Sequence, residues 1–270
     1  MKKALLMLSA VSVLLTISCS KSIDIPEDEK TEESCKIETL NQSKDDGSTE
    51  NQTPIFDSMG RLSQWTVKGS GYESVENFQY ESGKITVTGV EKTNNDSYNF
   101  STVYNLDNEG RISNVIESYY NMPLNIEYNT DGYLSEIKYA HSGINPFSSN
   151  VVYTYKDGNL IKILTTSNQL AGVHQRILEI TYNNDEITDP VIYDFLFSRV
   201  NRVYDEYFTN VSHLLGKRSK NAIKIITETD GLYTANETFT YERDSKGNIT
   251  KVTETSSNGI NVLNVSYKCD

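Results

Sequence analysis

The sequence lacks the short motifs that mark the common types of catalytic site. It contains no Gly-x-Ser-x-Gly elbow, no His-Glu-x-x-His pair, no phosphate-binding glycine loop and no close set of cysteines and histidines. Its three histidines, His141, His174 and His213, are isolated, and isolated histidines are usually ordinary residues rather than ligands. The sequence therefore predicts no catalytic residue, no metal site and no cofactor. A glycosidase-type pair of carboxylates carries no such motif, so the sequence would not locate one.

Long hydrophobic runs are also scarce, and the mean hydropathy is -0.51. The single long run, residues 4–17, follows Lys2 and Lys3 and is shorter than the roughly 20 residues that a transmembrane helix needs. We therefore predict that residues 1–18 are a signal peptide. Residues 15–19, Leu-Thr-Ile-Ser-Cys, resemble a bacterial lipobox, so we expect Cys19 to be lipidated. A plain secretory signal is the alternative.

Basic residues are outnumbered, with 25 Lys and Arg against 37 Asp and Glu and a formal net charge of -12. Such a surface should avoid nucleic acid and anionic lipid, so the expected contact with a membrane is through the N-terminal lipid. Residues 19–53 are polar and acidic without sustained periodicity, which predicts a disordered tether before a single domain at 54–270.

Acidic residues soon after a lipidated cysteine also resemble the surface-export signal of Bacteroides-type lipoproteins, although the first acid here is Asp24. The predicted location is the outer membrane of a Gram-negative bacterium, on its inner or its outer face.

Cysteine is rare, with three residues in the chain. If Cys19 carries lipid, Cys35 and Cys269 remain, and outside the cytoplasm a disulfide between them is allowed. Two free thiols are the alternative, because the sequence does not show whether the two Cα atoms lie within about 7 Å of each other.

The sequence is rich in one hairpin pattern, seen most clearly at residues 128–137, Tyr-Asn-Thr-Asp-Gly-Tyr-Leu-Ser-Glu-Ile. Variants occur at 56–65, 80–87, 104–115, 155–163 and 241–252. Dipeptides such as Asp131-Gly132 favour tight hairpin turns because glycine accepts the positive φ that these turns require. Consecutive hairpins predict an up-and-down antiparallel meander of about fourteen strands between Arg61 and Tyr267, strongly curved or barrel-like.

The alternation of residues after each turn predicts which face of the sheet is buried. In the copy at 128–137, Ile137 and Tyr139 lie on one face, whereas Glu136 and Lys138 lie on the other. Leu134 breaks this alternation, as do its equivalents in the other copies. We therefore expect a β-bulge in each hairpin, or a ladder in which these residues pack against the tyrosine before the turn.

One segment departs from the β pattern. From Asp189 and Pro190 onward, apolar residues recur every three or four positions, which predicts an amphipathic helical insertion at about 190–215 with a break near Asn210 and a stop at Gly216. Packing on the apolar concave face of the sheet is the expected role. A helix that binds a partner or a membrane surface is the alternative.

The hairpin repeats, the helix, the lipobox and the segments 215–221 and 241–252 together resemble a family of exported Bacteroides-type lipoproteins of unknown function with a porin-like β fold. The hairpin unit is also similar to bacterial YD-type repeats. The resemblance covers about residues 55–269 and implies a curved or nearly closed meander, with no catalytic residues to transfer. A pore is not implied, because the second face of the sheet carries polar residues such as Glu136 and Lys138 where a membrane barrel needs an apolar band.

Tyrosine is abundant, with 18 residues, and Tyr119, Tyr120, Tyr133 and Tyr153 are candidates for a surface that binds a glycan or a protein. The alternative is that these rings pack turns and cross-strand pairs. The leading hypothesis is a non-enzymatic, lipid-anchored cell-envelope protein that binds a glycan or an envelope protein. A glycan-acting hydrolase and an assembly factor that docks through the helix are the other two.

Overall fold

The computed structural model describes residues 35–117, 123–141, 147–169, 172–187, 189–200, 208 and 210–269. Its compact unit begins at Cys35. The predicted lipidation site at Cys19 and the predicted signal peptide at 1–18 lie outside the described residues.

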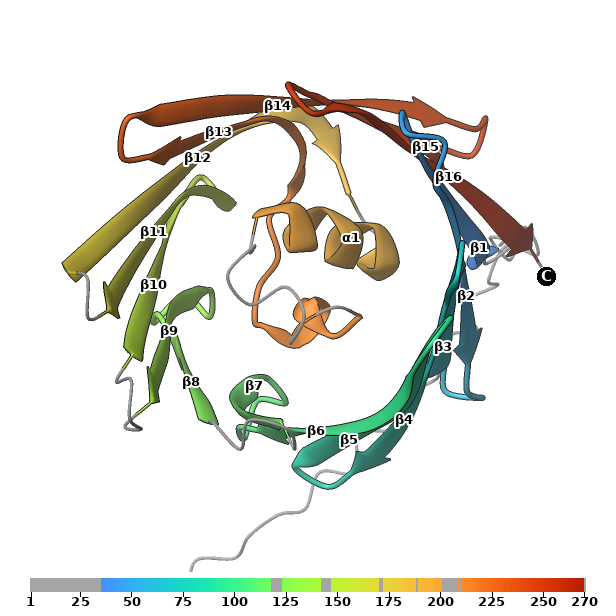
Figure 1. Cartoon of the computed structure of the whole chain (residues 1–270), viewed down its shortest axis with the longest axis horizontal. Coiled ribbons are helices and arrows are strands. Elements are labelled where there is room, and N and C mark those ends of the chain that lie inside the picture. The colour runs from blue at the N-terminus through green and yellow to red at the C-terminus, as the bar shows by residue number, and fades with distance from the viewer. Residues whose placement is uncertain are drawn as a thin grey trace, which may run out of the picture. The chain divides into compact units, whose positions relative to one another are not determined.

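Sixteen strands in the described part of the chain form a closed antiparallel barrel in which each strand pairs with its neighbours in sequence and β1 pairs with β16 (Figure 1). The strands are β1 (Cys35–Lys44), β2 (Thr49–Phe56), β3 (Leu62–Gly69), β4 (Tyr72–Glu81), β5 (Lys84–Thr93), β6 (Ser97–Leu106), β7 (Ile112–Glu117), β8 (Pro123–Tyr128), β9 (Leu134–His141), β10 (Phe147–Lys156), β11 (Asn159–Gln169), β12 (Gly172–Glu186), β13 (Asn221–Asp230), β14 (Tyr233–Arg243), β15 (Ile249–Ser256) and β16 (Gly259–Cys269). The predicted barrel-like meander is confirmed.

The barrel begins earlier than predicted, because residues 35–53 lie in β1, the turn after it and β2 rather than in a disordered tether. The predicted domain boundary at 54 is therefore wrong, and the rest of the predicted tether, 19–34, lies outside the described residues. Strands β3 to β16 cover the region in which about fourteen strands were expected, and β1 and β2 are additional. Apart from Ile55, the outward positions of β1 and β2 are polar, so the composition of this segment resembles that of a tether. Only the inward residues Ile37 and Leu40 are strongly buried and apolar in β1. Their strand pairs with β16, at the far end of the sequence, and this pairing cannot be inferred locally.

A β-bulge after each of several turns explains the break in the alternation, as predicted. Tyr128 pairs with Leu134 whereas Glu127 pairs with Glu136, so Ser135 is an extra residue. Because of this extra residue, both Leu134 and Ile137 point into the barrel, where they are fully buried. Equivalent register shifts occur in the hairpins β2–β3, β6–β7, β10–β11 and β14–β15.

A ladder of tyrosine hydroxyls runs along the end of the barrel that carries these bulges. Each hydroxyl donates to the backbone carbonyl of the apolar residue after an earlier turn, over distances between 2.5 and 3.0 Å. The pairs are Tyr80 with Leu62, Tyr128 with Ile112, Tyr182 with Leu160, Tyr241 with Ile223 and Tyr267 with Ile249. The repeated tyrosines are therefore structural at these positions, as the packing alternative predicted.

The helical insertion lies inside the barrel (Figure 1). Helix α1 (Pro190–Val200) buries Ile192 and Leu196 in the same core as the inward residues of the strands, and the 3-10 helix η1 (Ser212–Leu214) follows it. The Asp189 carboxylate caps α1 by accepting hydrogen bonds from the backbone N–H groups of Val191 and Ile192. Asn210 has a φ of 67°, so the expected break at this residue is confirmed.

The insertion leaves the barrel interior through Gly216, which forms an isolated β-bridge with Tyr133. Gly216 has a φ of +81°, and a Cβ atom added there would lie 2.5 Å from the carbonyl oxygen of Gly132. Only glycine fits this contact, which fixes the end of the insertion to the turn between β8 and β9.

The outer wall of the barrel is polar. Lys138 pairs with Glu127 and Lys251 pairs with Glu242, each at 2.8 Å and across neighbouring strands. The sheet is therefore mainly apolar on its concave face and mainly polar on its convex face, with exceptions such as the exposed Ile55 and Val173. This is the amphipathic pattern predicted from the sequence.

Among the described residues, no helix is both long and apolar enough to cross a membrane.

Candidate binding site

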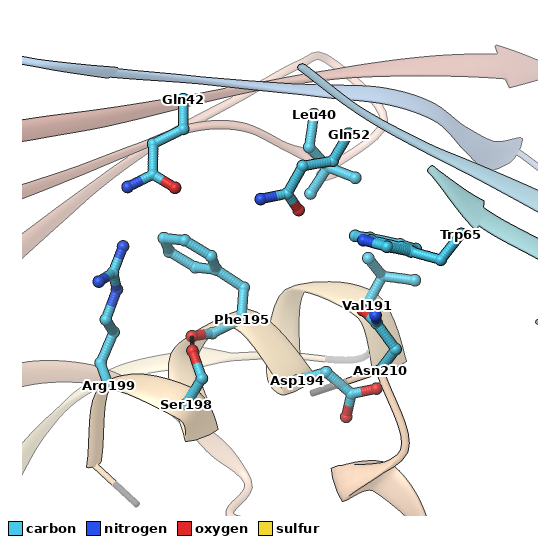
Figure 2. Close-up of a pocket in the computed structure, with 10 residues that line it drawn as sticks. All are labelled: Leu40, Gln42, Gln52, Trp65, Val191, Asp194, Phe195, Ser198, Arg199 and Asn210. Atoms are coloured by element: carbon cyan, nitrogen blue, oxygen red, sulfur yellow. Dashed lines mark hydrogen bonds between the residues drawn. The ribbon is translucent and has the colours of Figure 1, made fainter. Parts of the chain in front are cut away.

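A cavity of about 190 Å³ lies between helix α1 and the barrel wall at strands β1 to β3 (Figure 2). The strands contribute Leu40, Gln42, Gln52 and Trp65, and the insertion contributes Val191, Asp194, Phe195, Ser198, Arg199 and Asn210. Aromatic, aliphatic and hydrogen-bonding side chains therefore meet in one small space. This mixture is typical of sites that bind small molecules.

The wall side of the cavity follows from strand alternation. Leu40 and Gln42 are two residues apart in β1 and both point inward, and Gln52 is the cross-strand partner of Leu40. Trp65 is the cross-strand partner of Pro54 in the next pair of strands. The amide groups of Gln42 and Gln52 point from the wall toward Phe195 in Figure 2.

Among the described residues on the helix side of the cavity, Arg199 is the one cation. Its guanidinium lies 4.9 Å from the centroid of the Phe195 ring, and its Nε is 3.4 Å from Oε2 of Glu254 on β15. The Glu254 carboxylate is buried, so the two charges offset each other inside the barrel. The Arg199 side chain is 26% exposed, whereas Trp65 and Leu40 are deeply buried. The lining is therefore more exposed at Arg199 than at Trp65.

Asp194 connects α1 to η1 and was not identified from the sequence. Its carboxylate accepts a hydrogen bond of 2.5 Å from the Ser212 hydroxyl and lies 2.8 Å from Nδ1 of His213. These three residue types also occur in nucleophilic sites, but there the serine hydroxyl faces the histidine. Here the Ser212 hydroxyl donates to the aspartate, so the arrangement holds η1 against α1 rather than activating a nucleophile.

Glu76, an inward-facing residue of β4, lies next to the cavity. Its Oε2 atom accepts a hydrogen bond of 3.3 Å from the Asn210 side chain, which lines the cavity. Burial raises the pKa of Glu76 to about 7. No local signal in the sequence indicates this pair, because Glu76 and Asn210 are far apart along the chain.

The tyrosines proposed as a binding surface do not form one among the described residues. Tyr153 is buried inside the barrel with 5% exposure, so it contributes nothing to an exposed aromatic surface. Tyr133 lies near the exit of the insertion, 4.6 Å from Tyr155 between ring centroids, and the Lys217 ammonium lies 5.5 Å from its ring. Tyr119 and Tyr120 lie outside the described residues.

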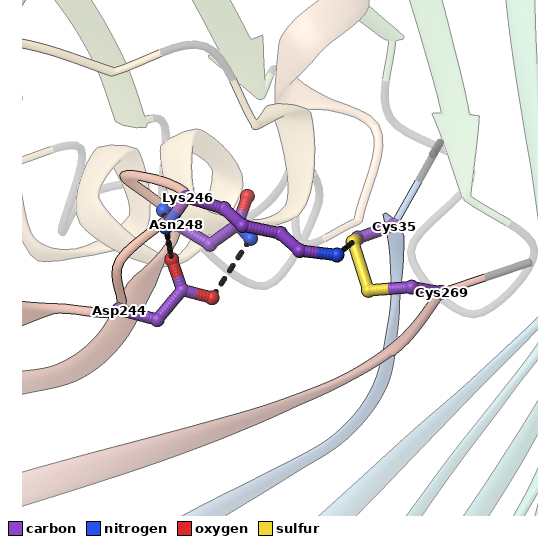
Figure 3. The surroundings of a disulfide bond; sticks show 5 residues. All are labelled: Cys35, Asp244, Lys246, Asn248 and Cys269. Atoms are coloured by element: carbon purple, nitrogen blue, oxygen red, sulfur yellow. Dashed lines mark hydrogen bonds between the residues drawn. A yellow bond between two sulfur atoms is a disulfide. The ribbon is translucent and has the colours of Figure 1, made fainter. Parts of the chain in front are cut away.

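The other two cysteines meet where the barrel closes. Cys35 at the start of β1 and Cys269 at the end of β16 form a disulfide with an S–S distance of 2.05 Å (Figure 3). The Lys246 side chain, in the turn before β15, reaches the Cys35 sulfur at 4.0 Å. In this turn the Asp244 carboxylate accepts hydrogen bonds from the backbone N–H groups of Lys246 and Asn248.

No group of three or more His, Cys, Asp or Glu residues in the described ranges is arranged to hold a metal ion.

No protein-family model matches this chain, and no curated protein matches its sequence. Solved structures do match its fold. A porin-like protein from Bacteroides uniformis ATCC 8492 aligns with a TM-score of 0.58 and 15% identity over 86% of this chain and 96% of its own. A porin-like protein from Bacteroides vulgatus ATCC 8482 aligns with a TM-score of 0.62 and 12% identity over 86% of this chain and 98% of its own. The chain therefore shares the fold of porin-like Bacteroides proteins over nearly their whole length.

Proposed function

We propose that the protein is a non-enzymatic binding protein of the bacterial cell envelope, anchored in the outer membrane through lipid on Cys19, and that its ligand is a glycan. The observation that carries the binding role is the cavity at α1, where aromatic rings and amide side chains face one small space. The lipobox and the porin-like Bacteroides proteins that share the fold support the envelope location.

The lining of the cavity favours binding over hydrolysis. A glycoside hydrolase uses two carboxyl groups that flank the scissile bond. Of the described residues that line this cavity, only Asp194 carries a carboxylate, and this carboxylate is already bonded to Ser212 and His213. The role as an assembly factor that docks through the helix has less support, because α1 lies inside the barrel and buries its apolar residues there.

The anchor is tested by changing Cys19 to serine. The wild-type protein should fractionate with the outer membrane, and the variant should be released into the soluble envelope fraction. Protease treatment of intact cells then separates the two faces of the membrane, since only a protein on the outer face should be cut. Unchanged membrane fractionation of the Cys19→Ser variant would argue against lipidation.

The binding role is tested by applying the purified protein to an array of envelope and dietary glycans. Saturable binding to a defined set of glycans is the expected result. If no glycan binds while an envelope protein is bound at a defined stoichiometry, the ligand is a protein. If the purified chain instead cleaves a bound glycan, the non-enzymatic role is refuted.

A further inference from the structure

The cavity at α1 is lined by polar groups that can bind a ligand, because no described residue forms a hydrogen bond with them. Gln42 is only 8% exposed, and its amide makes no hydrogen bond to any described residue. The indole N–H of Trp65, a residue that is 3% exposed, also finds no acceptor among the described residues. Native proteins leave few buried polar groups without a partner, because each costs about 1–3 kcal/mol. The Gln42 amide and the Trp65 N–H are therefore available to a ligand or to water in the cavity.

From these groups we infer that the cavity binds one neutral sugar residue, the end of a glycan chain or a free monosaccharide. This inference rests on the proposed glycan-binding function and names the site and the chemical class of its ligand. The Gln42 amide supplies a donor and an acceptor for hydroxyl groups, and the Trp65 N–H supplies a further donor. A hydroxyl group both donates and accepts, so it matches this set better than a group that can only accept or only donate.

The charges around the cavity favour a neutral ligand. Arg199 is held by Glu254 and by the face of Phe195, and the Asp194 carboxylate is held by Ser212 and His213. A charged ligand would have to break one of these arrangements and leave a partly buried charge without its partner, which is costly. A neutral ligand leaves both arrangements intact.

The size and the apolar lining fit a single ring. A cavity of about 150 Å³ is known to hold one benzene molecule, so this one, at about 190 Å³, has room for no more than one ring. Leu40, Trp65, Val191 and Phe195 provide apolar contacts, and a sugar ring offers C–H groups on its faces and hydroxyls at its edge. Because Trp65 and Leu40 are deeply buried and the space holds no more than one ring, the residue that enters would be a terminal one, with any remaining glycan outside.

Trp65 is the only tryptophan in the chain, so its fluorescence reports on this cavity alone. The experiment titrates the purified protein with neutral methyl glycosides of hexoses and N-acetylhexosamines, and in parallel with glucuronic acid and glucosamine. At least one neutral sugar should change the Trp65 emission in a saturable manner, and calorimetry should give the same affinity. The charged sugars should bind at least about tenfold more weakly.

The variant Gln42→Met keeps the side-chain length and removes both hydrogen-bonding groups. It should fold and should weaken binding by about tenfold or more, as expected for the loss of one to two hydrogen bonds. The matched control is Gln79→Met, because Gln79 is exposed on the outer face of β4 and should leave binding unchanged. If Gln42→Met does not fold, Trp65→Phe is the second variant, because phenylalanine keeps an aromatic ring and lacks the indole N–H. Calorimetry should then show weaker sugar binding by this variant than by the wild type.

The outcomes separate this inference from the proposed function. If array glycans bind but Gln42→Met and the Trp65 signal are both unaffected, the cavity site is refuted and glycan binding takes place elsewhere. Stronger binding of the charged sugars would refute the neutral class. The site would also be refuted if crystals soaked in the sugars showed ordered water and no sugar in the cavity. If no glycan binds the array or the cavity, the proposed function itself fails.

Discussion

The carboxyl group of Glu76 on β4 points into the barrel, and its protonation should control the free energy of unfolding near neutral pH. Burial raises its pKa to about 7, the Asn210 amide acts in the opposite direction, and the nearby Glu91 carboxylate adds to the rise. In the unfolded chain the pKa returns to its ordinary value of 4.5. The folded protein therefore binds more protons than the unfolded chain between pH 4.5 and about 7.

The sign of the pH dependence follows from that difference. The stabilisation is complete below about pH 4.5 and is lost as the pH rises through 7, so the free energy of unfolding should fall from pH 5 to pH 8. At about 1.4 kcal/mol per pKa unit, the upper bound of this contribution is about 3 kcal/mol. The variant Glu76→Gln should flatten the profile and be more stable than the wild type at pH 8, measured by urea unfolding at each pH.

Glu73 provides the matched control on the same strand. It faces outward and pairs with Lys68 at 3.0 Å, and the hydrogen bond from Lys68 lowers its pKa. Its own contribution therefore disappears only on acidification below about pH 4.5. Glu73→Gln should leave the slope between pH 5 and pH 8 unchanged. An unaltered slope in Glu76→Gln would show that another group causes the pH dependence.

At the scale of the element, the hairpin with its tyrosine is the repeating structural unit. The Tyr241 hydroxyl donates a hydrogen bond of 2.8 Å to the carbonyl of Ile223 on the neighbouring strand β13, and burial raises the pKa of Tyr241 so that it remains a donor. Tyr241→Phe removes this bond and leaves a partly buried carbonyl with one acceptor site unfilled. We expect a loss of about 1 kcal/mol in unfolding free energy.

The comparison for this change is Tyr233→Phe, because the Tyr233 side chain is 57% exposed at the start of the same strand, β14. Its hydroxyl should be solvated, so its removal should change the urea midpoint little. Equal midpoints for Tyr241→Phe and the wild type would mean that the tyrosine ladder contributes only through packing of its rings.

The elements could be predicted from the sequence where their signals are local. The Asp131-Gly132 turn, the off-parity Leu134 and the cap at Asp189 are each read within a few residues, and the hairpins, the bulge and α1 follow from them. Strand β1 and the cavity could not be predicted in this way. Gln42 lies in a segment of polar composition, and only its pairing with β16, which is distant in sequence, turns its amide toward α1.

At the scale of the whole molecule, closure of the barrel depends on the two ends of the sequence. Strand β1 forms its ladder with β16, and the Cys35–Cys269 disulfide covalently joins the same two strands across a sequence separation of 234 residues. The backbone pairing of β1 with β16 and the packing of the insertion inside the barrel do not involve the disulfide. The folded structure should therefore stay closed, and the main effect should fall on the unfolded chain, which loses a covalent loop.

The double variant Cys35→Ser, Cys269→Ser tests this argument. For a loop of this length, chain entropy gives a loss of stability of about 5 kcal/mol as an upper estimate, and measured losses are commonly about 2–5 kcal/mol. The urea midpoint should fall while the β-sheet circular dichroism of the folded protein is retained. The slope of the unfolding free energy with urea should rise, because the unfolded chain without the cross-link exposes more surface.

Wild-type protein unfolded in the presence of a thiol reductant should match the double variant, since both lack the covalent loop. A midpoint equal to that of the oxidised wild type would show that the loop contributes no stability. If the double variant lacked the β-sheet circular dichroism signal even without urea, β1 would pair with β16 only when the disulfide holds the two strands together. In that case the local signals in β3 to β16 would specify the hairpins, and the two cysteines would specify the closed barrel.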